Sequence, residues 1–386
     1  MILLCELTFL NRTHIPFNAG LLATIRAAFP QEDLAFWGEA VHVEELKKEV
    51  GHAFADSISW KHICPPAKGM GYVRRVICEL DILRSALNSM THETMSRLVL
   101  TSAQPSTVLA IKVVRWFRSN HVPVQMVLHA LSGVAGQRYR RPIRRLQDMK
   151  TALTLSGNAG LQYLVLERAI RDTVVGNLPH LAGHVETLEH PISPHEAASQ
   201  PVGLREPIRF GFLGLANKAK GFPLFVKTAG EVKVNYGPRV EFHAIGHTNE
   251  GSLPMDGIDA LASRPVSTKM SRADFIRNVS LLHFVILPHE AAHYSLAASG
   301  VLLDAITWGK PVIARKIPIF EAMFDRYGDI GYLFSDDAEL TKIVEGIVRS
   351  PDGSRYDLQV GNLGMAKTSR DPETLASAYR EICRNK

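Results

Sequence analysis

The sequence predicts an α/β protein of two domains, each built around a parallel sheet. The chain has 386 residues, more than one ordinary hydrophobic core accommodates, which favours two domains of roughly 150–200 residues each. In both halves short apolar runs alternate with amphipathic stretches, the pattern of parallel strands joined by crossover helices. Between the halves, residues 191–207 carry several prolines and no apolar periodicity, which indicates a linker.

The N-terminal domain is expected to span residues 1–190. Its first strand is the apolar run 2–7, which contains one charged residue, Glu6. The further expected strands are 33–37, 98–101, 124–128 and, more weakly, 152–155 and 172–175. The expected helices are 21–29, 41–50 and 108–120.

The C-terminal domain is expected to span residues 208–368, with clearer alternation. The run 281–287 is almost continuously apolar, as expected for a strand buried on both faces. The other expected strands are 208–213, 240–245 and 309–314, and the expected helices are 222–232, 271–278 and 301–307. Residues 369–386 are expected to form a last helix that crosses back to the first domain.

Composition indicates a cytoplasmic protein. No window reaches the roughly 18 consecutive apolar residues that a membrane-spanning helix needs, and the apolar start lacks the basic leader of a signal peptide. The four cysteines are scattered without a paired spacing, which favours neither a zinc site nor a disulfide framework, and they are Cys5, Cys64, Cys78 and Cys383.

The formal net charge is +6, and a dense basic run contributes much of it: Arg138, Arg140, Arg141, Arg144 and Arg145. Such a run attracts phosphates, whether of an anionic membrane surface or of an acceptor. A solvated helix face explains it equally well. Nucleic acid is a weaker candidate ligand, because no aromatic stacking platform accompanies the arginines.

The most informative stretch is residues 299–314. Ser299 and Gly300 precede an expected helix, where a glycine permits close approach of a ligand and the free amides of the first turn bind phosphate. Val301 belongs to that first turn, and Asp304 lies one turn further, within reach of sugar hydroxyls beside the phosphate. The alternative is an ordinary packed turn with a solvated Asp304.

This stretch resembles the donor-site signature of retaining GT-B glycosyltransferases, especially glycosyltransferase family 4. The family pattern is Glu, seven residues, Glu-Ala and a Gly-x-Pro-Val-Ile strand. Asp304-Ala305 matches the second Glu-Ala, and residues 309–313 match the strand. The resemblance implies that Asp304 binds the ribose of the nucleotide. The first acid is replaced by Ala297, and we expect His289 or Glu290 to replace it.

A second match is the segment Gly214-Leu-Ala-Asn-Lys-Ala-Lys-Gly221, which has the spacing of the family's Gly-Arg, four residues, Lys-Gly loop. The resemblance places Lys220 on the lysine that neutralises the donor diphosphate. Leu215 replaces the arginine, and we expect Lys218 to supply the missing charge.

In the N-terminal domain the resemblance rests on fewer residues. His129 follows a strand and matches the histidine that the family places beside the donor sugar, although a lone histidine is more often structural. Gly20 follows the first strand and matches the glycine-rich loop under the diphosphate, while His190-Pro191 precedes the linker.

The resemblance implies a GT-B fold, in which two Rossmann-like domains with parallel sheets face each other across a cleft. It also implies transfer of a hexose-type sugar, with retention, from a nucleotide diphosphate to a glycan or lipid-linked acceptor in polysaccharide or glycoconjugate biosynthesis. Lys220 and His129 are the expected catalytic residues. A sugar-nucleotide epimerase, an inverting transferase and a catalytically silent nucleotide-sugar-binding protein are the alternatives.

We expect no metal and no cofactor besides the sugar donor. Glu290 and His293 have the spacing of a metal-binding pair on a helix, but no third ligand accompanies them. The expected ligands are a nucleotide sugar, the acceptor and an anionic membrane at its inner face, without nucleic acid.

Overall fold

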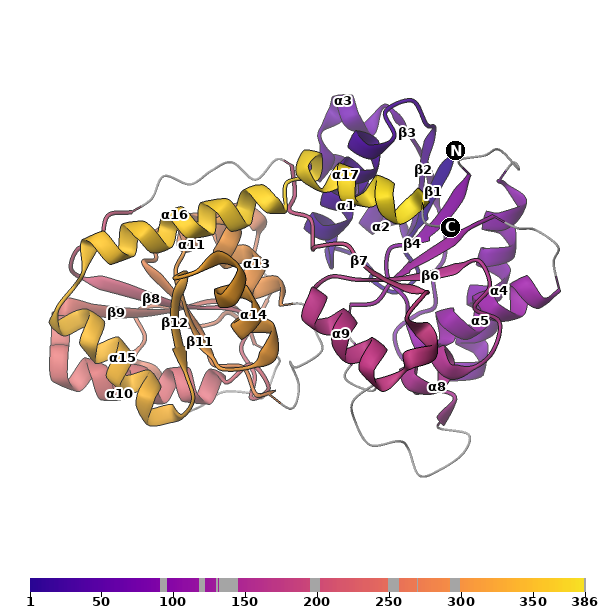
Figure 1. Cartoon of the computed structure of the whole chain (residues 1–386). Helices are drawn as coiled ribbons and strands as arrows, with labels where there is room; N and C mark the ends of the chain where they lie inside the picture. The colour runs from indigo at the N-terminus through magenta and orange to yellow at the C-terminus, as the bar shows by residue number, and fades with distance from the viewer. Residues whose placement is uncertain are drawn as a thin grey trace. The chain divides into compact units, whose positions relative to one another are not determined.

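The computed structural model describes residues 1–90, 96–117, 122–129, 131, 145–194, 202–248, 257–268, 270–291 and 299–384. The chain divides into two compact units (Figure 1). The N-terminal unit contains Met1–Glu196 and Arg370–Lys386, and the C-terminal unit contains Ala197–Ser295 and Ser299–Ser369.

The N-terminal unit is built on a seven-stranded, fully parallel sheet in the order β3-β2-β1-β4-β5-β6-β7. The strands are β1 Ile2–Cys5, β2 Leu34–Gly38, β3 Ile58–His62, β4 Arg97–Leu100, β5 Val124–Val127, β6 Leu161–Val165 and β7 Val185–Thr187. The helices are α1 Ile15–Ala28, α2 Ala40–Val50, α3 His52–Ala55, α4 Tyr72–Asn88, α5 Pro105–Trp116, α8 Met149–Thr154, α9 Arg168–Asn177, η1 Pro179–Leu181 and α17 Pro372–Arg384.

The core of this unit lies around β1. All four residues of β1 are buried, as expected for a strand with helices on both faces. The register pairs Leu4 with Phe36 of β2 and with Val99 of β4, and all three side chains are buried. Because β1 lies between β2 and β4, the strand order reverses its direction beside it.

The C-terminal unit is built on a five-stranded parallel sheet in the order β12-β11-β10-β8-β9. Its strands are β8 Ile208–Leu215, β9 Val240–His247, β10 Phe284–Leu287, β11 Val312–Arg315 and β12 Gly331–Phe334. Its helices are α10 Phe222–Tyr236, η2 Gly237–Arg239, η3 Ile258–Ala260, α11 Arg272–Ser280, α13 Gly300–Thr307, α14 Pro318–Tyr327, α15 Asp337–Arg349 and α16 Gly353–Ser369.

Stacked phenylalanine rings fill the centre of the second core. The ring of Phe210 on β8 lies 5.4 Å from that of Phe242 on β9 and 5.6 Å from that of Phe284 on β10. The two strands therefore flank β8, and the strand order reverses its direction between β8 and β10. In open parallel sheets, ligands bind outside the carboxyl ends of strands at such a reversal.

Two of the expected strands are wrong. Residues 152–155 mostly belong to α8, whose last carbonyls are held by the buried Lys112 ammonium, 2.8 Å from the Ala152 oxygen and 2.6 Å from the Leu155 oxygen. Residues 172–175 belong to α9, where Ile170 and Val174, four residues apart, form the buried face. The β-branched residues of these segments favour strands, but both segments form helices because their apolar residues pack on one face.

The segment around the expected linker is divided between the units. Ile192 N donates to the Arg370 carbonyl at 3.1 Å within the N-terminal unit, while the His283 ring bonds to the Gly203 carbonyl at 3.2 Å within the C-terminal unit. After Arg370, α17 packs against α1 (Figure 1). The buried Arg370 guanidinium, 3.1 Å from Glu167, fixes the start of this last segment.

Among the described helices, none combines the length and apolarity that crossing a membrane requires.

Candidate functional site

The turn after β8 is held by backbone and amide groups. Gly214 at the end of the strand has φ 86° and Gly221 has φ 73°, a region that favours glycine. The Asn217 side chain accepts from Lys220 N at 2.9 Å, and Gly221 N donates to the Lys218 carbonyl at 2.8 Å. A Cβ on Gly221 would lie 1.9 Å from the Pro288 oxygen, so only glycine fits there.

This turn places the Lys220 ammonium at the reversal point of the sheet. Lys220 Nζ lies 3.0 Å from where a Cβ on Gly214 would stand, and Val301 Cγ2 of α13 lies 3.6 Å from the same position. Gly214, Lys220 and Val301 therefore meet. Within the described part of the chain, no group forms a hydrogen bond or ion pair with this ammonium. Burial lowers the pKa of Lys220, and the neighbouring Asp304 carboxylate opposes that effect.

The first turn of α13 faces the same region. Ser299 is its N-cap, and the Ser299 hydroxyl accepts from Leu302 N at 3.3 Å. A Cβ on Gly300 would meet nothing within 4 Å among the described atoms, so packing does not require glycine there. The amides of this turn and the helix dipole make it a place for an anion next to Lys220.

Asp304 is half-buried and forms an ion pair with Arg272 of α11, with 3.2 Å between Nη1 and Oδ1. Burial raises the pKa of Asp304, while the Arg272 and Lys220 charges lower it. Arg272 is a site residue that the sequence analysis missed, because it lies 32 residues from Asp304 and only the fold joins them.

The loop after β10 contributes His289 and Glu290. The His289 ring is buried, 5.7 Å from the Phe320 ring, and burial followed by the Lys220 charge lowers its pKa to about 3. Its imidazole is therefore neutral at pH 7. Glu290 N donates to the Ala219 carbonyl at 3.0 Å, which ties this loop to the Lys220 turn.

Two other residues expected near the donor phosphate, Lys218 and Leu215, differ from Lys220 in burial or position. Lys218 is exposed, and Leu215 is half-buried at the end of β8. Positions 297 and 293 lie outside the described residues, and so do Arg138, Arg140, Arg141 and Arg144 of the basic run. Arg145 is described and exposed.

In the N-terminal unit, His129 follows β5 and is surrounded by rings. Its ring lies 4.5 Å from that of His14 and 4.6 Å from that of Phe17, and Phe17 lies 4.9 Å from His190. The His129 Nε2 lies 2.9 Å from the Thr101 carbonyl oxygen. Burial lowers the pKa of His129 and lowers that of His190 to about 3.

Gly20 lies elsewhere than expected. Helix α1 already begins at Ile15, with Pro16 in its first turn, so Gly20 is inside the helix and buried. A Cβ there would stand 2.4 Å from the Ile192 carbonyl oxygen. The glycine permits this helix to contact the 191–192 segment closely.

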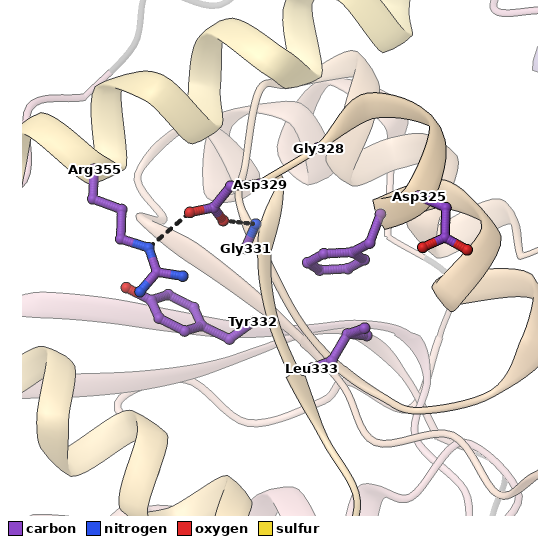
Figure 2. A pocket seen from close by; sticks show the side chains of 8 residues that line it. Asp325, Gly328, Asp329, Gly331, Tyr332, Leu333 and Arg355 are labelled. Carbon is purple, nitrogen blue, oxygen red and sulfur yellow. Dashed lines mark hydrogen bonds and ion pairs between the residues drawn. The ribbon is translucent and has the colours of Figure 1, made fainter.

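A shallow hollow of about 510 Å³ lies between α14, β12 and α16 (Figure 2). Arg355 Nε donates to Asp329 at 2.8 Å, and the guanidinium lies 4.3 Å from the Tyr332 ring centroid. Asp329 precedes β12, so the hollow belongs to the amino end of the sheet, opposite the edge that carries Lys220. The Arg355 and Asp329 charges in it already pair with each other.

Comparison with known proteins identifies relatives by structure alone. No model of a known protein family matches the chain, and no curated protein matches it in sequence. Among solved structures, HepE from Anabaena in complex with UDP superposes with a TM-score of 0.65 at 12% identity, covering 100% of both chains. The E. coli trehalose-6-phosphate protein bound with UDP-2-fluoro glucose superposes with a TM-score of 0.67 at 10% identity, covering 100% of this chain and 99% of that one.

An α,α-trehalose-phosphate synthase (UDP-forming) from Burkholderia vietnamiensis also matches, with a TM-score of 0.62 at 9% identity over 100% of both chains. These full-length matches confirm the predicted GT-B fold of two parallel-sheet, Rossmann-like domains. At such low identity they show the fold only, so membership of family 4 stays a prediction.

Proposed function

We propose that the chain is a glycosyltransferase that moves a sugar from a nucleotide-diphosphate donor to a glycan or lipid-linked acceptor. The observation that carries this proposal is the Lys220 ammonium, which lies beside Gly214 and Val301 where the strand order reverses and has no bonded group among the described residues. The structural relatives add support, because two of them are bound to UDP or a UDP-sugar.

The donor diphosphate would bind between Lys220 and the first-turn amides of α13. A charge-assisted hydrogen bond to phosphate and a helix N-terminus act on the same anion. Asp304, held by Arg272 at 3.2 Å, would accept hydrogen bonds from the ribose. His289 and Glu290, on the loop tied to the Lys220 turn, would contact the donor sugar in place of the acid absent at position 297.

In the transfer, the acceptor hydroxyl would form a bond to the anomeric carbon while the bond from that carbon to the diphosphate oxygen breaks. The hydroxyl proton would pass to the departing diphosphate oxygen. Negative charge then develops on the departing diphosphate. Lys220 and the α13 amides would stabilise that charge, which is electrostatic catalysis of the leaving group. His129 would orient the sugar. These groups supply the charge neutralisation, so we propose a transfer without metal and, from the family resemblance, with retention.

A screen of nucleotide sugars against the full chain tests the proposal. We expect one nucleotide sugar to raise the melting temperature and to release its nucleoside diphosphate when an acceptor is supplied. An isomerised donor without an acceptor would indicate an epimerase. Binding without any turnover would indicate a silent binding protein, and no binding at all would contradict the proposed class.

The basic run suggests where the acceptor is met. Each arginine near an anionic leaflet contributes about 1 kcal/mol, so we propose that the run binds an anionic membrane at its inner face. Sedimentation with anionic vesicles at low salt, lost when Arg140, Arg141, Arg144 and Arg145 are replaced by Gln, is the expected result. A wild type that ignores the vesicles would indicate a soluble acceptor.

A further inference from the structure

Glu6, at the carboxyl end of the central strand, is one of the carboxylates that the N-terminal unit buries. Its side chain is 0% exposed. One oxygen, Oε1, accepts from Thr8 N at 2.8 Å, from Phe9 N at 3.0 Å and from the Ser102 hydroxyl. The other, Oε2, accepts from the Thr101 hydroxyl at 2.9 Å.

A fifth donor, the Asn18 amide, lies 3.4 Å from Oε2. Burying a carboxylate is costly unless its oxygens are hydrogen-bonded, so this set of donors allows Glu6 to remain in the core. An aliphatic side chain would pack at this position without the cost of burying a carboxylate. The carboxylate therefore indicates a role other than packing.

The network leads directly to His129. The Thr101 hydroxyl is bonded to Glu6, and the carbonyl of the same residue lies 2.9 Å from His129 Nε2. A carbonyl only accepts, so Nε2 carries the proton. Because burial lowers the pKa of His129, the ring is neutral at pH 7. Its Nδ1 is then an acceptor.

Glu6 also fixes the loop that carries other rings of this cluster. By binding the amides of Thr8 and Phe9 it fixes the loop between β1 and α1, and the Phe9 ring stacks on His14 with 3.5 Å between centroids. His14 in turn lies 4.5 Å from His129. One buried carboxylate thus fixes both the group that sets the His129 proton and the rings that contact it.

We propose that Glu6 is a positioning residue of the sugar site: through Thr101 and Phe9 it fixes His129 as the Nε2–H tautomer, with Nδ1 accepting from a sugar hydroxyl. The sugar contact in this inference rests on the proposed function, whereas the tautomer of His129 is a property of the protein without ligand. The ligand group at His129 is therefore a hydroxyl, which donates, rather than a phosphate or carboxylate.

Histidine tautomers are read directly from ¹⁵N shifts of the full chain labelled at histidine, with His129 assigned by the loss of its signals in His129→Gln. We expect the Nε2–H form in wild type and a mixture of tautomers in Glu6→Gln, whose amide puts a donor where an acceptor is needed. The matched control is Glu39→Gln, because Glu39 accepts from Val41 N and His42 N nearby without reaching Thr101.

If Glu6→Gln does not fold, Thr101→Val serves instead, because it removes only the hydroxyl that bonds to Glu6 and keeps the carbonyl. An Nδ1–H tautomer in wild type, or an unchanged Nε2–H tautomer in a folded Glu6→Gln or Thr101→Val protein, would overturn the proposal. The tautomer of wild type and of both variants is measured without a substrate, so this test does not depend on the outcome of the nucleotide-sugar screen.

Kinetics with the donor found in that screen give the second readout. Glu6→Gln should lower kcat by up to about tenfold, no more than the loss expected for His129→Ala, because it misplaces that ring slightly. It should leave nucleoside diphosphate affinity within about twofold. Because both residues act through one ring, the double variant with His129→Ala should be no slower than His129→Ala alone. Losses that multiply, or a large loss of affinity, would contradict the role of Glu6.

Discussion

The two candidate sites occupy equivalent places in their sheets but are built from opposite chemistry. Outside β8, charged groups meet: the Lys220 ammonium lies in the field of Asp304, which is paired with Arg272. At the carboxyl ends of β1, β4 and β5, rings surround the neutral His129, and both oxygens of the nearby Glu6 carboxylate accept hydrogen bonds. The first arrangement suits an anion such as a diphosphate, and the second suits an uncharged, hydroxyl-rich sugar.

The largest effect is expected from the turn that presents Lys220. Gly221→Ala should destabilise the C-terminal unit by more than about 2 kcal/mol, because the left-handed conformation penalises a Cβ and the Pro288 oxygen blocks it. Gly230→Ala on the same helix meets nothing within 4 Å and should stabilise by about 0.4–1 kcal/mol. Denaturant unfolding measures both, and equal effects would contradict the account of the turn.

The charged site is tested by Lys220→Ala. Loss of a charge-assisted hydrogen bond should weaken nucleoside diphosphate binding by about 1.5–3 kcal/mol, which is roughly 10- to 150-fold in Kd. Lys227→Ala, on the exposed face of α10, is the control and should leave Kd unchanged. Calorimetry that finds equal affinity for Lys220→Ala and wild type removes Lys220 from the site.

The neutral site is tested by His129→Ala. We expect turnover to fall by about tenfold, because the sugar loses an orienting group, while nucleoside diphosphate affinity stays the same. His52→Gln, at an exposed position, is the control. If His129→Ala instead weakens the diphosphate as much as Lys220→Ala does, the division between a charged and a neutral site is wrong.

The smallest effect is expected at the ribose. Asp304→Asn should weaken the nucleotide by about 0.5–1.5 kcal/mol, more than Asp304→Glu, since the role needs an ionised acceptor. Arg272→Gln should also weaken binding, because Arg272 orients that carboxylate at 3.2 Å. Equal affinity for all of these forms would limit Asp304 to its structural ion pair with Arg272.

The sequence predicts those features that local rules determine. The Lys220 turn follows a strand, is bounded by two glycines and leads into a helix, all within a few residues of sequence. The structure places Lys220 and Val301 beside Gly214. The continuous apolar runs likewise predict the central strands β1, β8 and β10.

What the sequence does not predict depends on distant contacts. Arg272 reaches Asp304 through the packing of two helices, and Glu6 finds Thr101 at 95 residues' separation. In the sequence, Glu6 is only a charge inside an apolar strand. Gly20 is expected in a loop before the helix. It lies inside α1 instead, because that helix already begins at Ile15, and it lies close to Ile192.

Hydrogen exchange of the full chain tests the central division most directly, with the nucleoside diphosphate and the complete nucleotide sugar compared as ligands. We predict that the diphosphate protects amides in 214–222 and 300–305, and that the attached sugar adds protection in 6–14 and 101–104. Protection of the N-terminal segments by the diphosphate alone, or none at 214–222, would contradict the account.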